Sequence, residues 1–154
     1  MHRILRLCAV VFPLAAFAGC DSFVLPGFDG AEPVSGELIA MRQRWEAQGI
    51  DDYRYRYFAT CFCLFDEEVM ITVEDRRITS VRLVKNGEAV PREDWWLFPT
   101  VDELFARLAS AQRSGTYNDA VFHPRLGYPM TATIGTLEND AGVRHQLRDL
   151  EPAD

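Results

Sequence analysis

The sequence predicts a single α+β domain, with a curved antiparallel sheet and two helices packed on one of its faces. Two segments, residues 35–49 and 100–115, carry apolar residues at helical spacing. The other apolar residues fall in short runs separated by turn signals, which is the pattern of antiparallel strands. Because a helix with one apolar stripe must bury it, these elements favour one shared core.

The first helix is expected between Ser35, a residue suited to cap the amino terminus, and Gly49, which stands where a helix would end. Its apolar stripe comprises Leu38, Met41 and Trp45. Residues 53–63 then alternate between two kinds of position. Odd positions hold Tyr, Ala and Cys and even positions hold Arg, Phe and Thr, so this period of two predicts a strand.

Residues 69–73 and 78–84 are expected to form the next two strands, joined across the segment 74–77. Asn86-Gly87 is a strong turn signal after them, so the three strands should form an antiparallel meander. Residues 91–99, "PREDWWLFP", connect this meander to the second helix.

The second helix begins with a Thr100-x-x-Glu103 capping box and is expected to end near Gly115. Its apolar stripe comprises Val101, Leu104, Phe105 and Leu108. Three short strand candidates follow, at residues 119–124, 129–135 and 143–150.

The amino terminus has the order of a bacterial export signal. Arg3 and Arg6 precede an apolar run of 11 residues, 7–17, and small residues then lead to Cys20. The run is shorter than the ~20 residues that a membrane-spanning helix needs. "FAGC" resembles a lipobox, which predicts that residues 1–19 are a lipoprotein signal peptide and that Cys20 carries a diacylglyceryl group and an acyl chain such as palmitate.

Residues 20–35 then form a lipidated tether, and residues 36–154 form the single α+β domain. Two or three acyl chains suffice for stable membrane anchoring, so we expect a protein of the bacterial cell envelope that faces outside the cytoplasm, as in the periplasm. Loss of the signal leaves 14 basic against 23 acidic residues, a formal charge of −9. That charge disfavours nucleic acid as a partner, since nucleic acid requires basic patches.

Cys61 and Cys63 are the two cysteines left after Cys8 is removed with the signal and Cys20 is lipidated. In an oxidising compartment they favour a structural disulfide. Residues two apart in a straight strand have Cα atoms ~6.7 Å apart, near the upper limit for a bridge, so this bridge would require a bend. Buried free thiols, a redox pair, or a metal site completed by His123 or His145 remain alternatives.

Two connecting segments are candidates for binding. Residues 94–98, "DWWLF", concentrate apolar area in a loop, and residues 122–129, "FHPRLGYP", form a turn in which Tyr128-Pro129 is suited to a cis bond. Core residues and a fixed turn are the structural alternatives. The predicted binding residues are Trp95, Trp96, Phe98, His123 and Tyr128.

The order of several short motifs resembles a family of small bacterial lipoproteins catalogued only as a domain of unknown function. These motifs are Trp45, Asp52-Tyr53-x-Tyr55, Cys61-x-Cys63, Thr100-Val101-x-x-Leu104-Phe105 and His123-Pro124-x-x-Gly127-Tyr128-Pro129. The sequence departs from the family pattern at Phe122-His123-Pro124, where a Tyr-Asp-Pro segment is usual, and at Asp75-Arg76, where an Asp-Gly turn is usual. The resemblance implies a fold and a location but no reaction.

The sequence therefore predicts a non-catalytic binding or interaction domain, attached to a membrane by its lipid, whose partner is an envelope protein or a small ligand. It contains no phosphate-binding loop, Gly-x-Ser-x-Gly or His-Glu-x-x-His motif. We expect neither a cofactor nor a metal ion. The alternative is a thiol redox enzyme or metal-handling protein that uses Cys61 and Cys63.

Overall fold

The computed structural model describes residues 34–60, 65–136 and 142–153. Its elements, in chain order, are α1 (Gly36–Glu46), β1 (Tyr53–Thr60), β2 (Val69–Glu74), β3 (Arg77–Leu83), the 3-10 helix η1 (Arg92–Leu97), α2 (Val101–Arg113), β4 (Tyr117–Phe122), β5 (Pro129–Ile134) and β6 (Val143–Pro152). The predicted single α+β domain is confirmed, with a six-stranded antiparallel sheet and two main helices packed against it.

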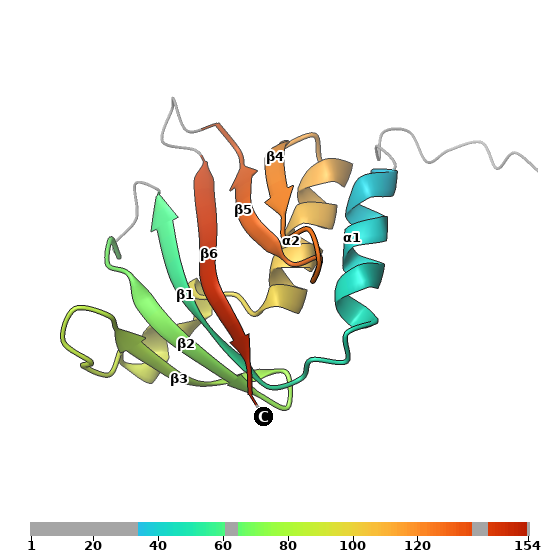
Figure 1. Cartoon of the computed structure of the whole chain (residues 1–154). Helices are drawn as coiled ribbons and strands as arrows, with labels where there is room; N and C mark the ends of the chain where they lie inside the picture. The colour runs from blue at the N-terminus through green and yellow to red at the C-terminus, as the bar shows by residue number, and fades with distance from the viewer. Residues whose placement is uncertain (1–33, 61–64, 137–141, 154) are drawn as a thin grey trace, which may run out of the picture.

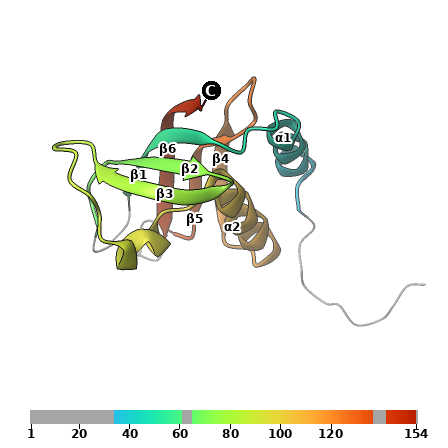
Figure 2. The same cartoon turned by 90° about the horizontal axis from the view of Figure 1, so that it is seen from below.

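The strand order in the sheet is β3-β2-β1-β6-β5-β4, and every neighbouring pair is antiparallel. Two three-stranded meanders therefore meet where β1 pairs with β6 at the centre. Helices α2 and η1 lie on one side of the sheet, and α1 stands beside α2 (Figures 1 and 2). Within the described part of the chain, no helix is long and apolar enough to cross a membrane.

Helix α1 begins as predicted at Ser35, whose hydroxyl accepts a hydrogen bond from the Leu38 N–H at 3.3 Å. Leu38 and Trp45 are buried and Met41 packs against the same core. Three residues after the helix, Gly49 takes a φ of 63°, which allows the chain to turn toward β1.

The alternation predicted for β1 is borne out for Tyr53, Tyr55 and Tyr57, which are buried on the helix side of the sheet. Their hydroxyls are all satisfied, as buried polar groups must be. Tyr53 accepts a hydrogen bond from the Val101 N–H at 3.0 Å, and Tyr55 donates to the Pro99 carbonyl. These two bonds connect the start of α2 to β1, one of the two central strands of the sheet.

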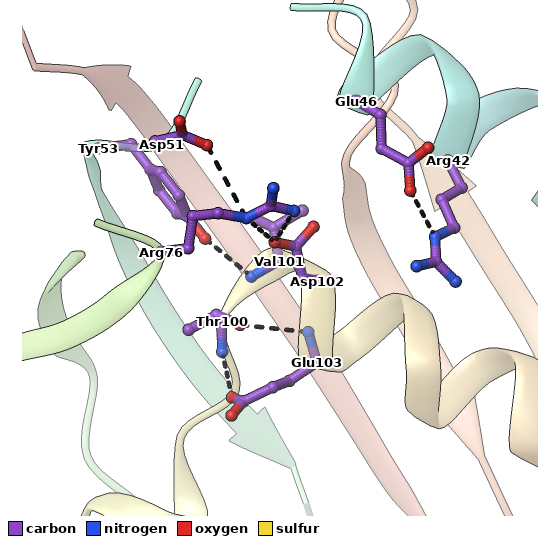
Figure 3. A network of polar contacts seen from close by, with 9 residues as sticks. All are labelled: Arg42, Glu46, Asp51, Tyr53, Arg76, Thr100, Val101, Asp102 and Glu103. Atoms are coloured by element: carbon purple, nitrogen blue, oxygen red, sulfur yellow. Dashed lines mark hydrogen bonds and ion pairs between the residues drawn. The ribbon is translucent and has the colours of Figure 1, made fainter. Parts of the chain in front are cut away.

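Strands β2 and β3 form the expected hairpin, and both residues of its turn, Asp75 and Arg76, have positive φ. Arg76 reaches from this turn to Asp102 in the first turn of α2, with its Nη2 2.8 Å from a carboxylate oxygen (Figure 3). After β3, Gly87 takes a φ of 73° and the chain folds back so that Ala89 pairs with Arg82.

Helix α2 has the predicted capping box, in which the Thr100 hydroxyl accepts from the Glu103 N–H and the Glu103 carboxylate accepts from the Thr100 N–H (Figure 3). The helix ends at Arg113, close to the expected Gly115. Its predicted stripe is fully buried and forms the centre of the core together with the inner face of the sheet: Val101, Leu104, Phe105 and Leu108.

Candidate functional site

A pocket of about 360 Å³ opens between the carboxyl-terminal half of α2 and the neighbouring strands β5 and β6. Its lining includes Arg107, three residues with hydroxyl groups and His145, together with the apolar Ala111, Ile134 and Val143. The lining residues are Arg107, Ser110, Ala111, Ser114, Thr116, Ile134, Val143 and His145. On α2 they recur every three to four residues, next to the stripe that packs on the sheet.

His145 is the buried polar residue of this pocket, with 4% of its surface exposed. It lies on β6 opposite Ala59 of β1 and Ala132 of β5, two small residues that leave room for its ring. Its Nδ1 lies 2.7 Å from the Tyr57 hydroxyl. Burial first, and the nearby Arg107 cation second, lower the pKa of His145 from 6.5 to about 4. The imidazole is therefore neutral at neutral pH.

Tyr57 shares this environment, because burial raises its pKa well above 10. The pair is thus an uncharged phenol and an uncharged imidazole joined by a hydrogen bond. Neither group is set for proton transfer near pH 7, since an imidazole with a pKa of about 4 binds a proton only weakly and a phenol with a raised pKa keeps its proton. The pair instead fixes the orientation of the His145 ring at the pocket.

Arg107 is half-buried, and its guanidinium makes one long contact, 3.5 Å, to the Trp96 carbonyl oxygen. No carboxylate of the described residues forms an ion pair with it. Most other described cations have a carboxylate neighbour or lie exposed on the surface. The pocket therefore combines a cation that has no carboxylate partner among the described residues with neutral hydrogen-bonding groups and apolar surface.

The three predicted binding residues of the aromatic loop, residues 94–98, differ in how far they are buried. Trp96 is 72% exposed, whereas Phe98 is 3% exposed and packs edge-on against Tyr57 and Phe65. Trp95 is half-buried, and its indole N–H donates to the Val90 carbonyl at 3.0 Å. Phe98 is therefore a core residue, which packs between the sheet and the connection into α2. In this loop, only Trp96 is mostly exposed to solvent.

The predicted turn at His123 to Tyr128 is a fixed structural turn. The His123 Nδ1 accepts a hydrogen bond from the Leu126 N–H at 3.0 Å, and the imidazole stacks on the Tyr128 ring at 5.0 Å. Tyr128 is 4% exposed and packs edge-on against Trp45. The bond between Tyr128 and Pro129, suited by sequence to the cis form, is trans.

Gly127 explains why this turn is so tight. Its φ is 86°, and a Cβ at this position would lie 2.6 Å from the Met41 carbonyl oxygen of α1. The Arg44 guanidinium also donates to the Pro124 carbonyl at 2.7 Å, so the turn is held against α1. The connection η1 lies at the opposite end of the domain in both views (Figures 1 and 2). The five predicted binding residues therefore do not form one surface.

The predictions for Cys20, Cys61 and Cys63 concern positions outside the described residues, and they stay predictions. Among the residues that the structure does describe, no group of three His, Cys, Asp or Glu side chains is arranged to hold a metal ion.

The pocket around His145 was not predicted as a site, although His145 was considered as a metal ligand. One signal was present: in "VRHQLRDL", His145 has the same parity as Val143 and Leu147, so it belongs to the buried side of its strand. What the pattern could not supply is its neighbour, since Tyr57 lies 88 residues away in sequence.

The fold and the pocket define a small antiparallel α+β domain with a binding-sized depression between one helix and the sheet. Residues 37–152 match the model of the Family of unknown function (DUF6174), and the chain belongs to that family. A search of curated proteins and a search of solved structures each found no match to the chain.

Proposed function

We propose that this protein is a lipid-anchored domain of the bacterial cell envelope that binds a small ligand with an oxyanion group in the pocket beside His145. The anchoring is supported by the order of basic, apolar and small residues before Cys20. It also agrees with the family match, which begins at residue 37, after the expected leader and tether.

The observation that carries the ligand class is the half-buried Arg107, which has no carboxylate partner in the part of the chain that the structure describes. Removing a guanidinium partly from water is costly unless an anion or several acceptors compensate for it. Arg forms strong paired hydrogen bonds with planar oxyanions, above all carboxylates. An oxyanion beside Arg107 would provide the compensation that the described residues do not.

The other pocket groups refine this ligand class. The exposed Ser110 hydroxyl can donate to a further ligand oxygen, while Ile134 and Val143 provide apolar contact. The Ser114 and Thr116 hydroxyls already bond each other and the Ala111 carbonyl. The neutral His145 adds no charge that would compete with Arg107 for the anion. A small carboxylate with an apolar part fits this combination better than a compact inorganic ion does.

A titration of the matured full-length protein in neutral detergent tests this proposal. The probes are benzoate, succinate and inorganic phosphate, with benzamide as the uncharged match of benzoate. We expect benzoate to raise the unfolding temperature and benzamide to leave it unchanged, because only the carboxylate pairs with Arg107.

Two variants make the test specific. Arg107→Met should weaken benzoate binding at least tenfold, since a hydrogen-bonded charge pair contributes ~1.5–3 kcal/mol. Arg113→Met removes the same charge from an exposed position on the same helix, outside the pocket, and should bind benzoate as the wild type does. Equal binding by both variants, or binding of benzamide as strong as that of benzoate, would contradict the proposal.

The thiol alternative predicted from Cys61 and Cys63 stays a separate prediction. It is tested by the intact mass of the matured protein before and after alkylation without reductant. Two alkylated thiols would favour it over the structural disulfide.

A further inference from the structure

By strand register, five arginine side chains of β1, β3 and β6 share the face of the sheet that α2 and η1 leave uncovered, which is the face toward the viewer in Figure 1. Arg77, opposite Glu74 beside the β2–β3 turn, lies at the edge of the same face. In β1, the arginines alternate with the buried tyrosines, and the strand register aligns the remaining ones with them. All five are exposed or half-exposed. We call this surface the arginine face; it consists of Arg54, Arg56, Arg82, Arg144 and Arg148.

The register places like charges next to one another. Arg56 of β1 is the direct partner of Arg148 of β6, and Arg82 of β3 lies in the same row beyond Met70. Like charges directly opposite each other in an antiparallel pair destabilise a sheet. In a chain with a net charge of −7, this concentration of cations in one row is a local exception to the overall charge.

Two of the five arginines are neutralised within the domain. Arg54 pairs with Glu151 at 2.5 Å and Arg56 with Asp149 at 3.6 Å. The other three bond neutral acceptors among the described residues: Arg82 the Gly87 carbonyl, Arg144 the Thr133 hydroxyl and Arg148 the Gln146 amide. Within the described ranges, three guanidiniums of the arginine face therefore lack a carboxylate partner.

We propose that the arginine face binds an extended acidic segment of a partner protein. Alternate residues of β6 point to this face, so Arg144, Gln146 and Arg148 are spaced ~6.7 Å apart. An extended segment laid along β6 has the same spacing between its alternate side chains. Glutamates at those positions would meet Arg144 and Arg148 in the paired geometry that guanidinium and carboxylate groups favour. This surface lies on the opposite side of the sheet from the pocket.

The charge pattern favours a protein over a membrane or a nucleic acid. Asp149 and Glu151 remain among the arginines, and Asp119 lies in the row of Arg144, across Thr133. A dense and uniform negative surface would be repelled by these carboxylates. A peptide can instead place each carboxylate opposite a guanidinium and leave the other positions neutral.

The test uses the matured full-length protein in neutral detergent and a fluorescent peptide of alternating Glu and Ser. We expect the peptide to bind, binding to weaken as salt is added, and a matched peptide of Gln and Ser not to bind. Vesicles of phosphatidylglycerol and a short DNA duplex serve as competitors and should displace the peptide poorly.

The double variant Arg144→Gln with Arg148→Gln should bind the peptide at least tenfold more weakly, and its stability in urea should be no lower than that of the wild type. Arg42→Gln with Arg113→Gln changes the net charge equally at exposed helix positions and should bind normally. Unchanged binding by the first pair, an equal loss in the second, or stronger binding of vesicles or DNA than of the peptide would overturn the proposal.

Discussion

Tyr57 and His145 illustrate how a polar pair is kept in the core of this domain. The two side chains come from the central strands β1 and β6, and each satisfies the other with one hydrogen bond of 2.7 Å. Satisfied in this way, two polar groups cost little, whereas either one left alone would carry its full desolvation penalty. The hydrogen bond therefore fixes the two side chains relative to one another, with His145 in the lining of the pocket.

Stability should fall on acidification because of His145. Its pKa is 6.5 in the unfolded chain and about 4 in the folded protein, so between these values the unfolded state binds the proton and the folded state does not. Stability due to this residue is complete above pH 6.5 and declines as the pH falls toward 4, by about 3 kcal/mol in all. Urea unfolding at pH values from about 7 to about 4.5 measures the decline.

The variant His145→Gln isolates this contribution, since all carboxylates titrate in both proteins. It should be less stable than the wild type at pH 7, and its stability should depend less on pH over the same interval. An equally steep dependence in the variant would refute the assignment to His145.

At the scale of elements, polar contacts connect the amino-terminal end of α2 to the sheet. The Tyr53 hydroxyl and Arg76 of the β2–β3 turn both contact the first turn of α2 (Figure 3). The Tyr55 hydroxyl bonds the Pro99 carbonyl just before the helix. Arg76 has a φ of 63°, in a region that suits glycine. The ion pair with Asp102 accompanies this unfavourable backbone conformation.

The cost of that conformation can be measured by comparing two substitutions. Arg76→Ala and Arg76→Gly both remove the ion pairs with Asp102 and Asp51, but only alanine keeps a Cβ in the left-handed region. We expect Arg76→Gly to be more stable than Arg76→Ala by about 1 kcal/mol in urea unfolding. Equal stabilities would mean that the turn relaxes to another conformation when the arginine is absent.

At the scale of the whole molecule, the domain has two differently built surfaces on the two sides of one sheet. The helix side contains the pocket with Arg107, and the open side contains the arginine face. In the two proposals together, the domain binds a small ligand on the helix side of the sheet and an acidic protein segment on the open side.

Anchoring itself is tested by the mass of the protein matured in a bacterial envelope. We expect the wild type to lack residues 1–19, to carry the mass of two or three acyl chains, and to partition into detergent. Cys20→Ser should carry no acyl mass because it lacks the thiol that accepts the lipid, while Cys8→Ser should mature as the wild type does. A water-soluble wild type of unmodified mass would rule out the lipoprotein assignment.

The sequence by itself determined the two main helices and the strands, the amino-terminal caps of the helices, and the core residues that lie within these elements. Local patterns suffice for these features, because the period of apolar residues and the chemistry of caps act over a few residues. The stripe of α2, the tyrosines of β1 and the capping box at Thr100 were all predicted in this way and are confirmed.

The tertiary structure alone decided which loop residues are buried and which distant residues meet. Phe98 and Tyr128 lie in connecting segments where no period indicates burial, and each is buried because an element far away in sequence packs over it. Strand pairing likewise decides that His145 meets Tyr57 and that the arginines of β1, β3 and β6 share one face of the sheet. Sites formed between distant segments depend on register and helix packing, which are properties of the folded chain as a whole.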